Sequence, residues 1–188
     1  MSSYRWGPEG PPPEAYSRVT NPERFAGLHE FADALLNRLE AEFAVQRAED
    51  YGLDPEMESV ELARPSVRLT PDDADAAPIL FTFTAFPGIA ARFGCWYWRT
   101  FPSCGCDACD ESAEGEFERL ESSIDDVIAG RFREEIRLPF FGKAFQTLEL
   151  WSPSGRSGGP LRLNRSKARQ LLAGSDRSLY EWKPWPVR

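Results

Sequence analysis

The sequence predicts an α+β domain, with an antiparallel sheet of about five strands and two long helices packed against it. The expected order of elements is α-β-β-β-α-β-β-α. Two long segments carry apolar residues at three- and four-residue steps, which is the periodicity of a helix. Other segments alternate apolar and polar residues between glycines and prolines, as the strands of hairpins do. No strand–helix–strand rhythm recurs, so a parallel sheet is not expected.

The chain has 188 residues, of which 41% are hydrophobic and 13% aromatic, enough for one domain with a sizeable core. The sequence has no run of about 18 apolar residues and no apolar signal-peptide core, so we expect a cytoplasmic protein. We expect three parts: a proline- and aromatic-rich arm over 1–18, the α+β domain over 19–152, and a basic, aromatic extension over 153–188 that packs on the domain. The oligomeric state stays open.

The net charge of −8 argues against general binding to nucleic acid or to an anionic membrane surface. This charge is unevenly distributed. From Pro153 onward, eight Lys and Arg residues stand against two acidic ones, a charge of +6, which leaves −14 for the residues before it. The basic extension is expected to lie on the acidic body of its own chain; the alternative is that it meets an anionic partner.

The first helix is expected from about Pro22 to about Asp50. Thr20 and Glu23 have the spacing of a capping box, and proline suits a first turn. An apolar stripe follows at helical steps: Phe25, Leu28, Ala32, Leu35, Leu36, Leu39 and Phe43. His29, the only histidine, lies beside this stripe. We interpret it as a half-buried flanking residue, with a ligand or catalytic role as the alternative.

The next segments predict strands. Residues 59–62 and 66–70 are expected to form an edge strand bent at Pro65. The clearest hairpin joins 79–86 and 92–101 around Pro87-Gly88, and we expect it at the centre of the sheet. Along 92–101, alternation places one set of side chains on one face and Trp96 and Trp98 on the other. The first set contains Phe93, Cys95, Tyr97 and Phe101.

The second half of the chain predicts a helix, two strands that turn at Gly142, and a final short helix. These elements are expected over 112–129, 132–138, 145–151 and 166–173. Gly130 and Gly174 end the two helices. The segment SPSGRSGGP, before the short helix, is expected to be a flexible loop.

The run Cys104-Gly105-Cys106-Asp107-Ala108-Cys109 has the spacing C-x-C-x2-C. A C-x2-C turn lets two thiolates reach one ion, and the glycine lets the backbone fold tightly enough for a third. Zinc prefers four ligands, so the fourth would be Cys95, His29, Asp110 or a water molecule. Cys95 is awkward in that role because its strand position also suits a buried, free thiol. The sequence predicts a zinc-binding cysteine knuckle.

Two other interpretations of the knuckle stay open. Cys106 and Cys109 form a CxxC pair at the start of the second helix, where the helix dipole lowers a thiol pKa, as redox sites require. The acidic neighbours oppose that effect, and no thioredoxin-like βαβ pattern is present. The thiols could also simply stay reduced in a tight loop that caps the helix, with Asp110 or Ser112 as the N-cap.

The run FPSCGCDACDE, the opening YSRVTNPERF and the tryptophan–proline tail resemble an uncharacterised family of small actinobacterial proteins of unknown function, with a CGCDACDE-type signature. The resemblance spans nearly the whole chain and implies no activity, substrate or catalytic residue. The opening is also similar in style to small acidic immunity proteins that neutralise bacterial toxins.

The sequence contains no known catalytic motif that would assign an activity. The sequence has one histidine and neither G-x-S-x-G nor H-E-x-x-H, and GxGxxG and P-loop motifs are also absent. Glu134 and Glu149 would form a carboxylate pair only if both faced a cleft. The leading hypothesis is a non-catalytic, immunity-like domain that binds a protein partner. The alternative is a thiol-redox or metal-dependent enzyme that uses Cys106 and Cys109.

Overall fold

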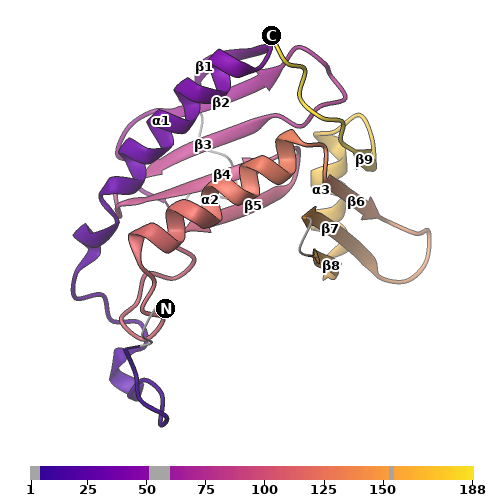
Figure 1. The fold of residues 1–188 in the computed structure, drawn as a ribbon. Helices are drawn as coiled ribbons and strands as arrows, with labels where there is room; N and C mark the ends of the chain where they lie inside the picture. The colour runs from indigo at the N-terminus through magenta and orange to yellow at the C-terminus, as the bar shows by residue number, and fades with distance from the viewer. Residues whose placement is uncertain (1–4, 51–59, 153–154) are drawn as a thin grey trace.

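The computed structural model describes residues 5–50, 60–152 and 155–188. Within them the chain forms two antiparallel sheets and three α-helices (Figure 1). The first sheet has the order β1-β2-β3-β4-β5, built from Val45–Asp50, Ser66–Pro71, Ile79–Thr84, Gly88–Phe93 and Tyr97–Phe101. This confirms the expected α+β class and the five-stranded antiparallel sheet.

A second, four-stranded sheet was not predicted. Its order is β8-β7-β6-β9, built from Gly155–Leu163, Ala144–Ser152, Phe132–Arg137 and Leu179–Glu181. Helices α1 (Gly27–Glu42) and α2 (Ala113–Ile128) cover one face of the first sheet, whereas α3 (Arg165–Ala173) lies beside the second sheet (Figure 1). The expected element order therefore holds only in part.

The main core lies between the first sheet and the two long helices. One face of the sheet contributes fully buried side chains: Leu69, Ile79, Phe81, Phe83, Ile89 and Phe93. Helix α1 buries the leucines of its predicted stripe against them, and Phe31 of α1 stacks on Phe117 of α2 with ring centroids 4.6 Å apart. Burial of this apolar surface supplies most of the stability of the fold.

The first helix is shorter than predicted. A 3-10 turn spans Pro22–Phe25, and α1 ends at Glu42, where the Phe43 N–H donates to Leu39 O. The segment predicted as the helix's last turns forms β1 instead, paired with β2 over its whole length. The residues of this segment are compatible with a helix by local preference, so pairing with a neighbouring strand is what makes the segment a strand.

The predicted strand over 92–101 is two strands. Gly94 adopts φ +62°, and the turn of Gly94, Cys95 and Trp96 reverses the chain between β4 and β5. Phe93 and Tyr97 still face each other, with ring centroids 6.0 Å apart, but Cys95 lies in the turn. β5 is consequently an edge strand, so the predicted central position holds for β3 and β4 only.

The strand predicted at the edge of the sheet also differs from the prediction in its position. Residues 66–70 lie within β2, which is an inner strand because β1 pairs with its outer side. Of the upstream part, residue 59 falls outside the described residues, and Leu62 forms a single bridge with Thr84.

The glycine-rich segment predicted as a loop forms most of β8, whose register runs from Ala144↔Leu163 to Ser152↔Gly155. Gly158 explains why this sequence suits a strand here: a Cβ at this position would lie 1.9 Å from Leu148 O. The close approach therefore needs glycine. By contrast, α2, α3 and the strands β6 and β7 lie where the sequence predicted them.

The C-terminal residues cross from the second sheet to the first. After β9 pairs with β6, the buried Trp185 donates from Nε1 to Ala77 O at 2.8 Å, and the Ala44 N–H donates to Pro186 O. Lys183 Nζ lies 2.8 Å from the Asp75 carboxylate, next to β3. Within the described part of the chain, no helix is both long and apolar enough to cross a membrane.

Candidate metal centre

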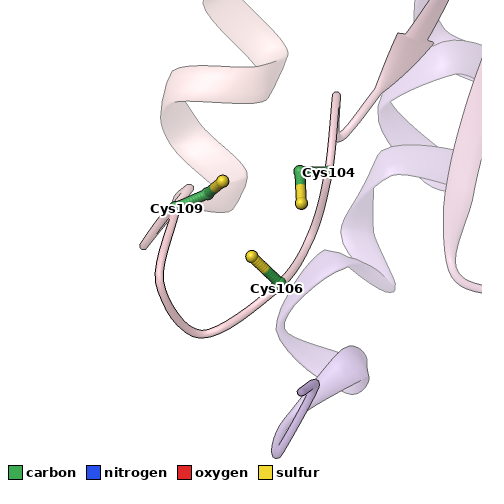
Figure 2. Close-up of side chains that lie close together, drawn as sticks. All are labelled: Cys104, Cys106 and Cys109. Atoms are coloured by element: carbon green, nitrogen blue, oxygen red, sulfur yellow. The ribbon is translucent and has the colours of Figure 1, made fainter. Parts of the chain in front are cut away.

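Three cysteines meet in the loop between β5 and α2. The sulfur atoms of Cys104, Cys106 and Cys109 all lie within 4.8 Å of one another, and Figure 2 shows them pointing toward a common centre. Cys106 is buried, whereas Cys104 and Cys109 are exposed. Sulfur atoms at this separation can share one metal ion.

Local hydrogen bonds hold the loop in this shape. Glu111 Oε2 accepts from the backbone N–H groups of Cys104 at 3.1 Å and Gly105 at 2.7 Å. Gly105 adopts φ +76°, and a Cβ there would lie 2.8 Å from the Phe86 ring. Only glycine fits this backbone and this contact, so the residue between the first two cysteines is set by geometry.

The buried Asp107 ties the loop to the N-terminal segment. Its carboxylate accepts from Arg18 Nε and from the N–H and hydroxyl of Thr20, each at 3.0 Å. The Asp107 N–H donates to Arg18 O, and the Ala108 N–H donates to Ala15 O. The Thr20 N–H and the Arg18 guanidinium lower the pKa of Asp107. This carboxylate is therefore occupied by hydrogen bonds to the N-terminal segment, and it does not belong to the cysteine cluster.

Cys106 and Cys109 have pKa values shifted in opposite directions. A hydrogen bond from Cys104 and the backbone N–H of Cys109 lower the pKa of Cys106 to about 7. The hydrogen bonds with Cys104 and Cys106 raise the pKa of Cys109 to about 12. Of these two thiols, Cys106 therefore ionises more readily, because its sulfur accepts hydrogen bonds from its neighbours. Backbone N–H donation to sulfur is also a usual outer-shell feature of metal thiolates.

The structure does not bring Cys95 or His29 to this cluster. Among the described residues, the group that could hold a metal ion contains the three knuckle cysteines alone. His29 Nε2 lies 3.0 Å from Gly88 O, and its ring meets Phe83 edge-on. Burial, and then the charge of Glu134, raise the pKa of Cys95 to about 11 in its own turn. Asp110 is also outside the cluster: it adopts φ +51° and its Oδ2 accepts the backbone N–H of Arg5 at 3.3 Å.

Sequence reasoning missed the role of Glu134, and the pair with Glu149 does not form. Adjacent strands place Glu134 opposite Leu148 and Glu149 opposite Arg133, so the two carboxylates lie on opposite faces of the sheet. Glu134 is fully buried, and its carboxylate accepts three N–H groups, from Cys95, Trp96 and Trp182. The sequence did contain a signal for this role, because Glu134 occupies an inward-facing position in a strand of alternating residues.

The chain belongs to a family of unknown function, DUF6226, whose profile matches residues 2–188. No curated protein and no solved structure matches the chain. The family description names no activity.

Proposed function

We propose that the chain is a non-catalytic protein-interaction domain whose cysteine knuckle binds a structural zinc ion. The observation that supports the interaction is a pair of aromatic rings at the tip of the β6–β7 hairpin. Phe140 and Phe141 are 87% and 83% exposed, and their rings meet edge-on with centroids 4.7 Å apart. Exposed neighbouring aromatics of this size typically mark a contact surface.

The hairpin tip has a fixed backbone. Arg165 at the start of α3 donates from Nη1 to Pro139 O at 2.8 Å and Gly142 O at 2.9 Å, and from Nη2 to Phe140 O at 3.4 Å. One guanidinium therefore holds the loop on both sides of the two rings. Because the loop is already ordered, binding through the rings loses less conformational entropy.

The surroundings of the rings suggest the kind of partner. Arg137 and Lys143, at the two ends of the loop, are both exposed. A protein with an apolar pocket and an acidic rim fits this arrangement. An immunity-like role, with a toxin as the partner, belongs to this proposal, as do the cytoplasmic location and the lack of nucleic-acid and membrane partners. The expected actinobacterial origin and cysteine signature stay predictions.

A double variant tests the interaction. Phe140→Ser with Phe141→Ser removes both rings, and Val187→Ser, at a residue 74% exposed on another surface, is the matched control. We expect tagged wild type and the control to retain a stoichiometric protein partner from the source cells, and the double variant to lose it. Recovery of the same partner by all three proteins, or turnover of a substrate by the isolated chain, would contradict the proposal.

The zinc proposal rests on the three thiols. Cys104, Cys106 and Cys109 would supply three thiolates, and a water molecule would complete four ligands. Bound zinc would stabilise the junction of the N-terminal segment, β5 and α2. We expect protein purified without chelator to hold about one zinc per chain with protected thiols. Metal-free protein with four freely titrating thiols would instead support the interpretation that the loop holds reduced thiols without a metal.

A thiol-redox enzyme is the second candidate, because the lowered pKa of Cys106 favours a thiolate at neutral pH. In that case the Cys106 thiolate attacks a disulfide substrate, which forms a mixed disulfide and releases one substrate thiolate. Cys109 then attacks the Cys106 sulfur, which forms a Cys106–Cys109 disulfide and releases the second substrate thiolate. The burial of Cys106 limits access to the attacking sulfur. Selective fast alkylation of Cys106 at pH 7 would favour this candidate; slow, uniform alkylation of all four cysteines would exclude it.

A further inference from the structure

The cysteine knuckle offers one site with three sulfur ligands. Cys104, Cys106 and Cys109 point toward a common centre from one loop (Figure 2). Across the described part of the chain, no other His, Cys, Asp or Glu joins this group. Zinc prefers four ligands, so it would need a water molecule here. A thiophilic ion that forms only three bonds would find all of its ligands in the knuckle.

The carboxylates beside the cysteines are engaged elsewhere. Asp107 and Asp110 accept hydrogen bonds from the N-terminal segment. Glu111 accepts from the backbone N–H groups of Cys104 and Gly105. A hard cation, which prefers oxygen ligands, would have to break these hydrogen bonds to reach the carboxylates. The geometry of the loop therefore favours a soft ion held by sulfur alone.

The charge of the loop favours an adduct without a net charge. The run 104–111 contains three acidic residues and no basic one. Arg18 pairs with Asp107 at 3.0 Å and Arg119 lies 3.7 Å from Glu111, so arginines offset two of these charges. Three thiolates leave a charge of −2 on a monovalent ion, −1 on a divalent ion and none on a trivalent ion. Only the trivalent adduct adds no negative charge to an acidic loop.

The three thiols differ in their access to solvent. Cys104 and Cys109 are exposed, whereas Cys106 is buried in a small cluster with Ala15, against which Trp6 packs. A small solute therefore meets the two exposed sulfurs first, and Cys106 then supplies the third bond from the buried side. Because the loop already holds the three sulfurs together, binding loses less conformational entropy.

We propose that the cysteine knuckle binds trivalent arsenic, which it takes up as arsenite, the small neutral oxyacid As(OH)3. At each cysteine an As–O bond and an S–H bond break, an As–S bond forms, and the hydroxyl and the proton leave as water. Three such exchanges release three water molecules. Arsenic stays trivalent, so the reaction needs no oxidant or reductant. The proposal does not require the structural zinc, because arsenite and zinc would use the same sulfurs and exclude each other.

Arsenite binding to the full chain tests the proposal directly. The protein is reduced, freed of metal with a chelator, checked for its fold by circular dichroism and titrated with arsenite. We expect about one arsenic per chain after gel filtration, by elemental analysis. Cys95→Ser is the matched control, because Cys95 lies outside the cluster, and it should change the affinity less than twofold. Absence of bound arsenic, or a tenfold loss of affinity in Cys95→Ser, would overturn the proposal.

A second arsenical tests the third sulfur. Phenylarsine oxide forms only two bonds to thiols, because its phenyl group occupies the third position on arsenic. Cys106→Ser leaves the sulfurs of Cys104 and Cys109. We expect this variant to bind arsenite at least about tenfold more weakly than wild type, and phenylarsine oxide less than about threefold more weakly. Similar losses for both arsenicals would show that no third As–S bond forms, and would overturn the proposal.

Zinc analysis of the same preparations before chelation separates this proposal from the structural zinc. Protein that is purified without zinc and binds one arsenic per chain would support the arsenic site and contradict the zinc site. Protein that is purified with zinc, and whose metal-free form is folded but binds no arsenite, would overturn the arsenic site alone.

Discussion

The Glu134 carboxylate on β6 accepts the backbone N–H of Cys95, in the β4–β5 turn, at 2.6 Å. The same carboxylate accepts Trp96 N at 2.9 Å and Trp182 Nε1 at 3.1 Å. Glu134 therefore joins the second sheet to a turn of the first sheet and to the C-terminal segment. The same turn also lines a cavity between the first sheet and α3.

Protonation of Glu134 should make stability depend on pH. Burial raises its pKa from 4.5 to about 7, against the three N–H donors that favour the ionised form. The folded state then keeps a proton that the unfolded chain releases. The resulting stabilisation is fully present below pH 4.5 and is lost as pH rises through about 7, up to about 3 kcal/mol. Urea unfolding at pH 5, 6 and 7 should show this decline.

The variant Glu134→Gln is the control for that titration. It cannot ionise, so its stability should not decline over this range in the same way. It should also be less stable than wild type at pH 5, by about 1–3 kcal/mol, because the amide replaces one acceptor oxygen with a donor that faces N–H groups. A decline of equal slope in wild type and variant would assign the pH dependence to other groups.

Substitution of Gly94 should disrupt the same contact. A Cβ there would lie 2.3 Å from Glu134 Oε1, and the residue adopts φ +62°. Gly142 has φ +94° with no atom within 4 Å of a Cβ, so it reports backbone strain alone. We expect Gly142→Ala to cost about 1–2 kcal/mol and Gly94→Ala clearly more, in urea denaturation. Equal costs would mean that the neighbours of Gly94 relax freely.

Zinc binding should require the knuckle cysteines and should not require Cys95. We expect Cys106→Ser to reduce the zinc content from about one ion per chain to near zero. Cys95→Ser, in a turn on another part of the fold, should leave it unchanged. Metal analysis after gel filtration measures both. Loss of zinc in Cys95→Ser with an intact fold would place Cys95 among the ligands after all.

Asp107 should control how firmly the N-terminal segment is held. Asp107→Asn keeps the size of the side chain but removes the charge paired with Arg18 and one acceptor oxygen. We expect amide exchange over residues 15–20 to become about tenfold faster or more, with little change in β3. Thr20→Val removes a single hydroxyl donor to Asp107 and should have a smaller effect. Unchanged exchange in Asp107→Asn would show that other contacts hold the segment.

Features that depend on neighbours in sequence were predicted well. Helix α2 begins after Ser112, whose side chain accepts from the Gly115 N–H, and ends before Gly130 at φ +69°. The C-x-C-x2-C spacing similarly brings three thiols together, because the loop over 104–109 is only six residues long and turns at Gly105. Metal binding at this cluster stays a prediction.

Features that depend on distant partners were not predictable in this way. The amphipathic helices, most strands and the cysteine knuckle could be predicted from the sequence, because caps, periodicity and short spacings act within a few residues. Long-range contacts explain why the segment after α1 is a strand, why a glycine-rich segment pairs with β7, and why Cys95 contacts Glu134. Each of these depends on a backbone or a side chain far along the chain, and local preferences differ too little to select such partners before the chain folds.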